Sequence, residues 1–284
     1  MILRQTRVKK KVLLIIQIVI FAIMYDWRLI LLLAIAMLLL AYNRMKKSRK
    51  VYRRLPDRPF PKQWRDILKR RVPFYNRLKA IEKTKFEEEI HIFLLNYRII
   101  GAGTEVSDLD RILVAAGGVI PTFRLEKWHY LKLDTVVIYP DKFLIPETDQ
   151  MAKGLVGWGE MAGQMWLSRK ALYQGFHDQT DNKNVAIHEF IHLMDMQDGM
   201  VDGVLEGLMQ EEDVKNWQNL FEEKAALIAS HENASIRRYA KTSPVEFLAA
   251  TGEHYLENPD ELRREHPRVY EVLERIFNPK KNWF

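Results

Sequence analysis

The sequence of 284 residues contains no cysteine, which excludes a disulfide framework and every metal site that is built on thiolate ligands. Glycine and proline are also scarce, with 13 and 11 residues, so collagen-like and low-complexity chains are excluded. Hydrophobic residues make up 48% of the chain, which is enough to build a buried core and argues against a disordered chain. A metal ion bound by this protein would therefore need histidine and carboxylate ligands.

Acidic residues are almost absent from the first 54 residues. This segment holds 13 Lys and Arg and a single acid, Asp26, for a net charge of +12, whereas residues 55–284 hold 31 bases and 36 acids, for a net charge of −5. The N-terminal segment therefore accounts for the whole net charge of +7. A basic chain can indicate nucleic-acid binding. Because the larger part is acidic and carries no recognisable nucleic-acid motif, we expect no direct nucleic-acid partner.

Two apolar runs lie within this basic segment. Residues 12–25 and 29–42 contain no charged side chain, and an Asp-Trp-Arg triplet separates them. A spanning helix needs about 20 apolar residues, and one continuous helix would bury the two charges of the triplet at about 2.5–3.5 kcal/mol each. The pattern therefore predicts a hairpin of two short transmembrane helices, at about residues 10–25 and 28–43.

Basic clusters flank both ends of the predicted hairpin, and positive residues favour the cytoplasmic side of a membrane. We predict that residues 1–54 form a membrane segment in contact with the lipid of an inner or plasma membrane, and that residues 55–284 form a cytoplasmic domain. Two alternatives are one span with an interfacial helix and a cleaved signal peptide. A signal peptide is disfavoured because a second basic cluster, not a small-residue cleavage site, follows Tyr42.

The remaining chain reads as a mostly helical domain with a small sheet. Three prolines in residues 55–61 indicate a linker. Apolar periodicity predicts helices, and β-branched runs predict strands; the helices are expected at residues 64–71, 78–93 and 107–116, and the strands at 135–139 and 165–168. Gly117 and Gly118 are expected to end the third helix, and residues from 182 onward to be mostly helical. Because strands and helices are partly segregated, the predicted fold class is α+β.

One short motif carries metal chemistry. Residues 188–192 read His-Glu-Phe-Ile-His, which is the H-E-x-x-H pattern. On a helix, His188 and His192 lie on one face and can bind one Zn²⁺, while Glu189 can act as the general base. Asp181 or Asn182 would cap this helix. An exposed helix with two incidental histidines is disfavoured, because the flanking residues are apolar and a buried polar group without partners is costly.

A catalytic zinc ion with two histidines needs a third protein ligand, and the sequence offers several. Asp198 has the spacing of the third ligand in the metzincin pattern. That pattern also needs a glycine three residues after the second histidine, where this sequence has Asp195. Asp195 lies on the helix face of His192, where it could orient a ligand histidine. Glu246 and Glu253 are seven residues apart on a later helix, so they share a face, and either could be a ligand.

Several separated segments together resemble one family. The matching anchors run in order through residues 135–143, 157–160, 184–199 and 239–249. With Leu167, Ser168 and Glu253, they resemble the Mlc titration factor A family of zinc metallopeptidases, which is similar in catalytic layout to the anthrax lethal factor protease domain. The resemblance extends over roughly residues 60–279 and implies a zincin-like metallopeptidase fold.

The resemblance also implies a set of site residues. Zn²⁺ would be held by His188, His192 and Glu246, a gluzincin-type arrangement, with Glu189 as the general base. The Tyr239 hydroxyl would stabilise the oxyanion, a role in which a hydrogen-bond donor meets developing negative charge. Asp195 and Glu253 then remain as candidates for carboxylates that orient the ligands.

The predicted function is a membrane-anchored, zinc-dependent metallopeptidase that hydrolyses a peptide or protein substrate through a zinc-activated water. The alternative is a regulatory binding protein that sequesters a transcription regulator and has weak or no peptidase activity. Aromatic residues Trp158, Trp166 and Phe190 are candidates for lining the cleft. The segment 166–168 is the strand on which an extended peptide is expected to pair.

Overall fold

The computed structural model describes residue 17 and residues 54–279, except 126–127, 158, 179–181, 206, 231–239 and 241. The chain divides into two units, residues 1–53 and 54–284, and the following account concerns the second. The predicted membrane hairpin lies outside the described residues apart from Gln17. Among the described residues, no helix combines the length and the apolar character that a membrane span requires.

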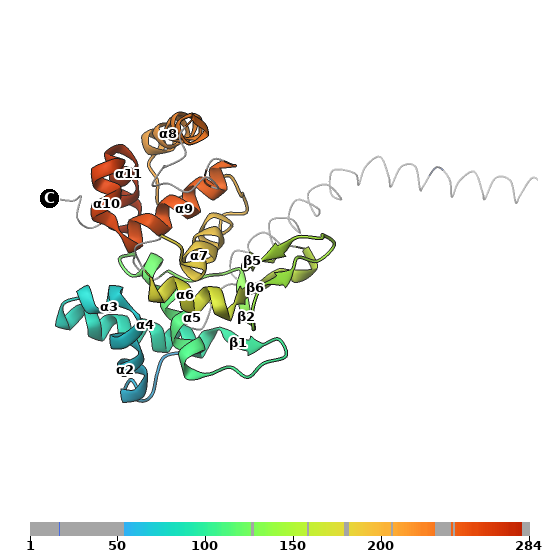
Figure 1. The fold of residues 1–284 in the computed structure, drawn as a ribbon, viewed down its shortest axis with the longest axis vertical. Helices are drawn as coiled ribbons and strands as arrows, with labels where there is room; N and C mark the ends of the chain where they lie inside the picture. Colours follow the sequence, from blue (N-terminus) through green and yellow to red (C-terminus); the bar gives the residue numbers. More distant parts are fainter. Residues whose placement is uncertain are drawn as a thin grey trace, which may run out of the picture. The chain divides into compact units, whose positions relative to one another are not determined.

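Three helices open the second unit, as Figure 1 shows: α2 (Lys62–Arg71), α3 (Pro73–Arg77) and α4 (Ala80–Asn96). The helices expected at 64–71 and 78–93 are confirmed as α2 and α4. The short α3 was not expected; Pro73 stands at its first turn, where proline favours a helix start because it lacks only a hydrogen bond that this position would not make. Leu68, Phe86 and Ile90 from α2 and α4 are fully buried and begin the core.

The next helix, α5 (Asp108–Thr122), runs straight through the two glycines that were expected to end it. That prediction is wrong, and the reason is tertiary packing. A Cβ atom at Gly117 would stand 2.5 Å from Cβ of Ala186, and one at Gly118 would stand 2.6 Å from the ring of Phe93. The glycines therefore let α5 approach its neighbours closely, and that packing offsets the cost of about 1 kcal/mol that each glycine adds within a helix.

A four-stranded sheet lies beside α5 in the order β1 (Arg98–Gly101), β2 (Leu133–Tyr139), β6 (Gly163–Ser168) and β5 (Gly154–Val156). The two predicted strands are confirmed as β2 and β6. Strands β1, β2 and β6 are parallel, whereas β5 runs antiparallel to β6 and forms one edge of the sheet. A small hairpin of β3 (Phe143–Leu144) and β4 (Met151–Ala152) and the 3₁₀ turn η1 (Gly159–Met161) connect β2 to β6.

The rest of the described chain is mostly helical, as expected from residue 182 onward, whereas α6 was not expected. The elements are α6 (Arg169–His177), α7 (Val185–Asp195), α8 (Glu211–Ser230), α9 (Pro244–Glu257), α10 (Pro259–Glu265) and α11 (Pro267–Phe277). Three of these helices have proline in the first turn. Helix α7 contacts α5, α9 and β5, and Figure 1 shows it between the sheet and the C-terminal helices. It therefore occupies the centre of the second unit.

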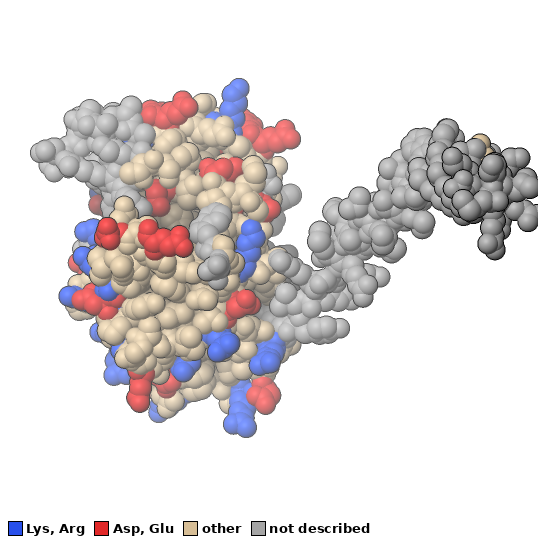
Figure 2. All heavy atoms as spheres, turned by 90° about the vertical axis from the view of Figure 1, so that its right-hand side faces the viewer, with Lys and Arg blue, Asp and Glu red and all other residues tan. Residues whose placement is uncertain are grey.

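The surface of this unit carries charges of both signs. Figure 2 shows one face, on which basic and acidic side chains of the described residues are interspersed rather than gathered by sign. Below that surface, the buried aliphatic and aromatic residues form a single connected cluster that reaches from α2 to α11. This continuous core makes the sheet and both groups of helices one folded body that can hold a site rigidly.

Candidate metal centre

Helix α7 carries the H-E-x-x-H motif and is capped by Asn184, whose side chain accepts a hydrogen bond from the backbone N–H of Ile187 at 3.3 Å. The expected cap at Asn182 is wrong, because the chain enters the helix two residues later; Asp181 lies outside the described residues. His188 and Glu189 are buried, with 9% and 7% of their surfaces exposed. The cap fixes the first turn of α7, so it fixes the direction in which His188 leaves the helix.

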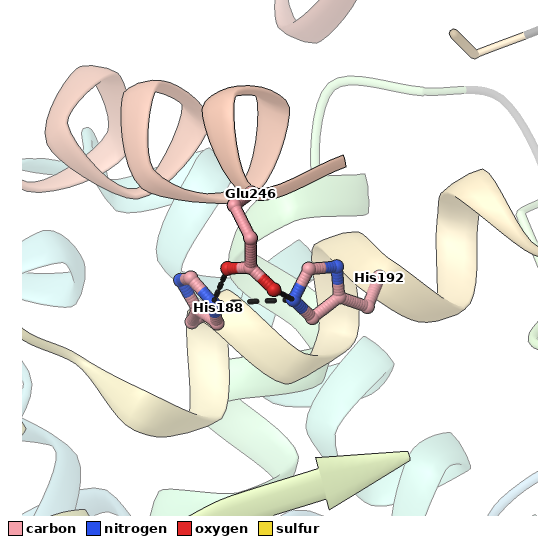
Figure 3. A group of neighbouring side chains, drawn as sticks. All are labelled: His188, His192 and Glu246. Atoms are coloured by element: carbon pink, nitrogen blue, oxygen red, sulfur yellow. Dashed lines mark hydrogen bonds and ion pairs between the residues drawn. The ribbon is translucent and has the colours of Figure 1, made fainter. Parts of the chain in front are cut away.

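Three donor side chains converge at one point, as Figure 3 shows: His188, His192 and Glu246. The Nε2 atoms of the two histidines are 3.1 Å apart. Glu246 lies opposite them on α9, with Oε2 at 3.2 Å from Nε2 of His188 and Oε1 at 3.5 Å from Nε2 of His192. Their ligand atoms all lie within 4.8 Å of one another, so one ion could reach all three.

These separations fit a tetrahedral metal ion. Around an ion whose ligands lie at about 2.0–2.1 Å, neighbouring donors stand about 3.3 Å apart, and the observed 3.1, 3.2 and 3.5 Å lie close to that value. Two imidazoles and one carboxylate leave the fourth tetrahedral position open, as catalytic zinc sites do. The donor set and its spacing therefore suit zinc.

The local structure of α9 delivers Glu246 to this point. Ser243 caps the helix, accepting from the N–H of Glu246 at 3.2 Å, and Pro244 follows in the first turn. A loop between α7 and α8 packs against the start of α9: its Gly203 adopts φ 76° and lies against the backbone of Pro244. Asp195, at the end of α7, accepts a hydrogen bond from the N–H of Gly203 at 3.0 Å. Its carboxylate thus holds the loop that supports α9, in place of the expected contact with a ligand histidine.

Glu253 lies one heptad after Glu246, on the same face of α9, and its side chain is fully buried. Its Oε2 lies 3.1 Å from Nδ1 of His188, and its Oε1 accepts from the backbone N–H of Asn184. One carboxylate therefore contacts both the first turn of α7 and the ring of a candidate ligand. Such a carboxylate fixes which histidine nitrogen points toward the metal.

Burial and neighbouring charges shift the pKa values of the motif in the metal-free protein. Burial raises the pKa of Glu189 to about 7, against the opposing charge of His188. Burial also lowers the pKa of His192 to about 4. For His188, burial acts downward, but hydrogen bonds to Glu246 and Glu253 outweigh it and raise the pKa to about 10. Binding of a metal ion at neutral pH would therefore displace a proton from His188.

A cleft of about 880 Å³ opens beside the three donors. Its walls come from β5, α6, α7 and α9. Besides the three donors and Glu189, the cleft has both polar and apolar lining. The polar lining includes Lys153, Gln174, His177, Asp178 and Lys183, and the apolar lining includes Leu155, Met196, Val201 and Val245. A cleft of this size and mixed lining can hold several residues of a peptide.

The structure corrects the expected cleft aromatics and peptide strand. Phe190 is fully buried and packs against Phe93 and Tyr130, so it belongs to the core. Trp166 lies on β6, which is paired with β2 on one side and β5 on the other. No edge of β6 is open to a peptide, because the edge strands of the described sheet are β1 and β5. Trp158 and Tyr239 lie outside the described residues.

Sequence reasoning missed two residues that border the motif. Gly154 on β5 faces Glu189, and Asn184 caps α7 and meets Glu253. Asn184 had a detectable signal, since asparagine is a preferred cap and directly precedes the apolar periodic run. Gly154 had none, because a single glycine in a short strand does not reveal which helix faces it.

Comparison with known proteins agrees with this geometry. A family model described as glucose-regulated metallo-peptidase M90 matches residues 43–278. An uncharacterized protein of Synechocystis sp. is 32% identical over 241 residues, which are 79% of this chain and 86% of that protein. Proteins named Mlc titration factor A from Yersinia pestis and Yersinia pseudotuberculosis are 27% identical over 232 residues, which are 76% of this chain and 83% of theirs.

Proposed function

Because the chain belongs to the glucose-regulated metallo-peptidase M90 family, we propose that it is a zinc-dependent peptidase whose ligands are His188, His192 and Glu246. The observation that carries this proposal is the convergence of three donors at 3.1–3.5 Å around one point. A His₂Glu set with an open fourth position is a donor set of catalytic rather than structural zinc. The cleft beside the donors supplies room for the substrate.

Bound zinc would supply Lewis acidity, which acidifies a water molecule and polarises the scissile carbonyl. The chain's own residues supply the proton transfers. Glu189 follows the first ligand directly and lines the cleft, so its carboxylate is the group that accepts a proton from the attacking water and then donates it to the leaving amine. The Tyr239 hydroxyl stabilises the negative charge that develops on the carbonyl oxygen.

Strand β5 offers the substrate a backbone to pair with. Ser168 donates its N–H to the carbonyl of Lys153 at 2.7 Å, and Gly157 donates to the carbonyl of Gln164 at 2.8 Å, so residues 153 and 157 bond toward β6. Alternate residues of a strand point their backbone groups to opposite sides. The backbone groups of Gly154 and Val156 therefore face the open edge, where an extended peptide would add a strand beside the metal centre.

The rival function is sequestration of a transcription regulator with little or no cleavage. It draws on the name of the Yersinia relatives, Mlc titration factor A. The intact Glu189 beside three convergent donors favours catalysis, because binding alone needs no general base. If Glu189→Gln abolishes cleavage and leaves partner capture unchanged, the two activities are separate, and both would belong to this chain.

We further propose that residues 1–54 anchor the peptidase as a hairpin in an inner or plasma membrane, with the peptidase in the cytoplasm. The support is the pair of uncharged apolar runs between basic flanks. Topology reporters fused after Trp27 and after Phe284 test this directly. Opposite sides are expected, and reporters on the same side would refute the hairpin.

The deciding experiment measures zinc content and peptide cleavage together. The wild-type protein should hold one zinc ion and cleave peptides. Glu189→Gln should retain the zinc and lose cleavage, whereas His188→Ala should lose both. Glu271→Gln on α11 is a matched control, because that exposed carboxylate is not among the residues that line the cleft. Stoichiometric zinc in His188→Ala would refute the ligand assignment, and unchanged cleavage by Glu189→Gln would refute the base.

A further inference from the structure

The edge strand β5 and the motif helix α7 touch at one residue without a side chain. A Cβ atom at Gly154 would stand 2.4 Å from Oε1 and 2.7 Å from Cγ of Glu189, and 2.6 Å from Cγ2 of Val185. Carbon atoms in contact normally lie about 3.5–4.0 Å apart. The side chain of Glu189 therefore occupies the space that a side chain at residue 154 would take, and any side chain there would have to displace it.

Space, and not backbone conformation, requires this glycine. The described glycines with positive φ are Gly103, Gly159, Gly163, Gly199, Gly203 and Gly207, and Gly154 is not among them. Residue 154 sits in regular antiparallel pairing with Leu167 of β6, a conformation that every residue adopts readily. A methyl group at residue 154 would therefore leave the strand geometry allowed and act mainly through the atoms that it meets.

We propose that Gly154 is a positioning residue, which holds the Glu189 carboxylate in place by leaving it a seat on the edge of the sheet. The inference rests on the proposed peptidase function and deepens it. The backbone N–H and C=O of the same residue face the open edge of β5. One residue would therefore both leave space for the Glu189 carboxylate and pair with the substrate backbone. The register of a bound peptide is thereby tied to the position of the group that transfers the proton.

Val185 is the alternative route for such an effect, since a Cβ atom at residue 154 would also meet its Cγ2. If the glycine only lets α7 pack against β5, a methyl group would act through Val185 and leave Glu189 in place. The two routes separate when the Glu189 side chain is shortened, because that change removes the Oε1 and Cγ contacts and leaves the Val185 contact intact.

A comparison of unfolding midpoints tests the seat without any activity. The metal-free, full-length protein is unfolded as wild type, Gly154→Ala, Glu189→Ala and the double variant. We expect Gly154→Ala to lower the midpoint clearly, and its effect to shrink to less than half in the Glu189→Ala background, where two of the three close contacts are removed and only the one with Val185 remains. Equal losses in both backgrounds would overturn the proposal. If the single variant does not fold, a folded double variant supports the seat, and failure of both variants overturns it.

Kinetics test the consequence for catalysis. In zinc-loaded Gly154→Ala we expect kcat to fall about tenfold to a hundredfold, as misplaced catalytic groups do, with KM and metal content unchanged. In a Glu189→Ala background, which removes both the Oε1 and the Cγ atoms that face residue 154, the further loss in the residual cleavage should be much smaller. An equal fold-loss in both backgrounds would mean that Gly154 acts on the substrate strand alone and would refute the positioning role.

Gly117→Ala is the matched control. Its Cβ atom would meet Cβ of Ala186 at 2.5 Å, so it also strains α7, but it contacts Ala186 instead of Glu189. We expect this variant to lose stability and to keep its kcat per metal-loaded molecule; an equal loss of kcat would contradict the proposal. Cleavage by the wild type and its loss in Glu189→Gln test the peptidase function separately. The unfolding comparison decides the role of Gly154 even in a chain that cleaves no peptide.

Discussion

At the residue scale, the H-E-x-x-H motif buries a carboxyl group, Glu189, and burial of an ionised carboxylate costs stability. Glu189 is almost fully buried, and burial raises its pKa from the ordinary 4.5 to about 7. A carboxyl group whose pKa is raised by folding contributes its full stability only below its unfolded-state pKa, and that contribution is lost as the pH rises through the folded-state pKa. Such a cost is retained where a proton must be accepted and released near neutral pH.

Glu189→Gln should therefore stabilise the metal-free protein. In the wild type the stability linked to this group is fully present below pH 4.5 and is lost as the pH rises through about 7. The neutral amide avoids that loss, so at pH 8 the variant should gain on the order of 1–3 kcal/mol, and at pH 5 much less. Urea unfolding in the presence of a chelator at both pH values measures the difference. An equal gain at the two pH values would contradict the raised pKa.

Glu253 offers a second prediction at this scale. It contacts Nδ1 of His188 and the first turn of α7 from a fully buried position. Glu253→Gln keeps the shape but removes the charge, and we expect metal affinity to fall about 10–100-fold, the usual cost of losing such a partner. Competition with a chromophoric chelator measures the affinity. Unchanged affinity, compared with the control Glu271→Gln, would show that the contact does not orient the ligand.

The sequence predicted the metal centre better than its surroundings. His188, Glu189 and His192 were singled out by the H-E-x-x-H motif, and they lie beside Glu246 and Glu253. Spacing left these two carboxylates open as alternative ligands, and only the family resemblance selected Glu246. The proximity of Gly154 to Glu189 could not be predicted, because it depends on which strand lies beside α7 in the folded protein. Asp195 shows the same limit: its position one turn after His192 was clear, but the loop at Gly203 that its carboxylate binds is a tertiary feature.

At the element scale, two helices with different N-cap residues carry the side chains of the site. Helix α7 is capped by Asn184, and α9 is capped by Ser243, whose side chain accepts from the N–H of Glu246. The third ligand candidate therefore sits in the first turn of its helix, where the position of the side chain depends on the cap. Packing can also override local sequence preference. The two glycines of α5 were expected to end that helix, but close packing against α7 keeps the segment helical.

Ser243→Ala should lower both stability and metal affinity. Loss of a serine cap costs about 1 kcal/mol, and fraying of the first turn of α9 should loosen Glu246. Ser168→Ala is the matched control, because Ser168 caps α6 in the same way by accepting from Ala171 and lies on no donor helix. We expect a similar fall in urea midpoint for both and a fall in zinc affinity for Ser243→Ala only. Equal zinc affinity in the two variants would refute the role of the cap.

At the scale of the whole molecule, opposite charges are concentrated in different parts of the chain. Residues 1–54 carry +12 and the apolar runs, and residues 55–284 carry −5 and the metal centre. The fold of the second part, mostly helical with a small sheet, was predictable because its strands and helices have distinct periodicities. Its exact sheet order was not, since β5 is three residues long and joins the sheet only through pairing with β6.

This charge separation leads to a prediction that distinguishes insertion into a membrane from adhesion to its surface. Basic flanks alone would hold the chain on anionic lipid by Coulomb attraction, which 1 M salt screens to a Debye length of about 3 Å. Apolar runs inserted in the bilayer are insensitive to salt. We therefore expect the full-length protein to sediment with membranes after washing in 1 M salt, and a chain that starts at residue 54 to remain in the supernatant with the same kcat/KM.

Residues 1–53 fused to an unrelated soluble protein should sediment equally well, which would show that this segment suffices. Release of the full-length protein by salt would refute the hairpin and leave only surface attraction by the basic clusters.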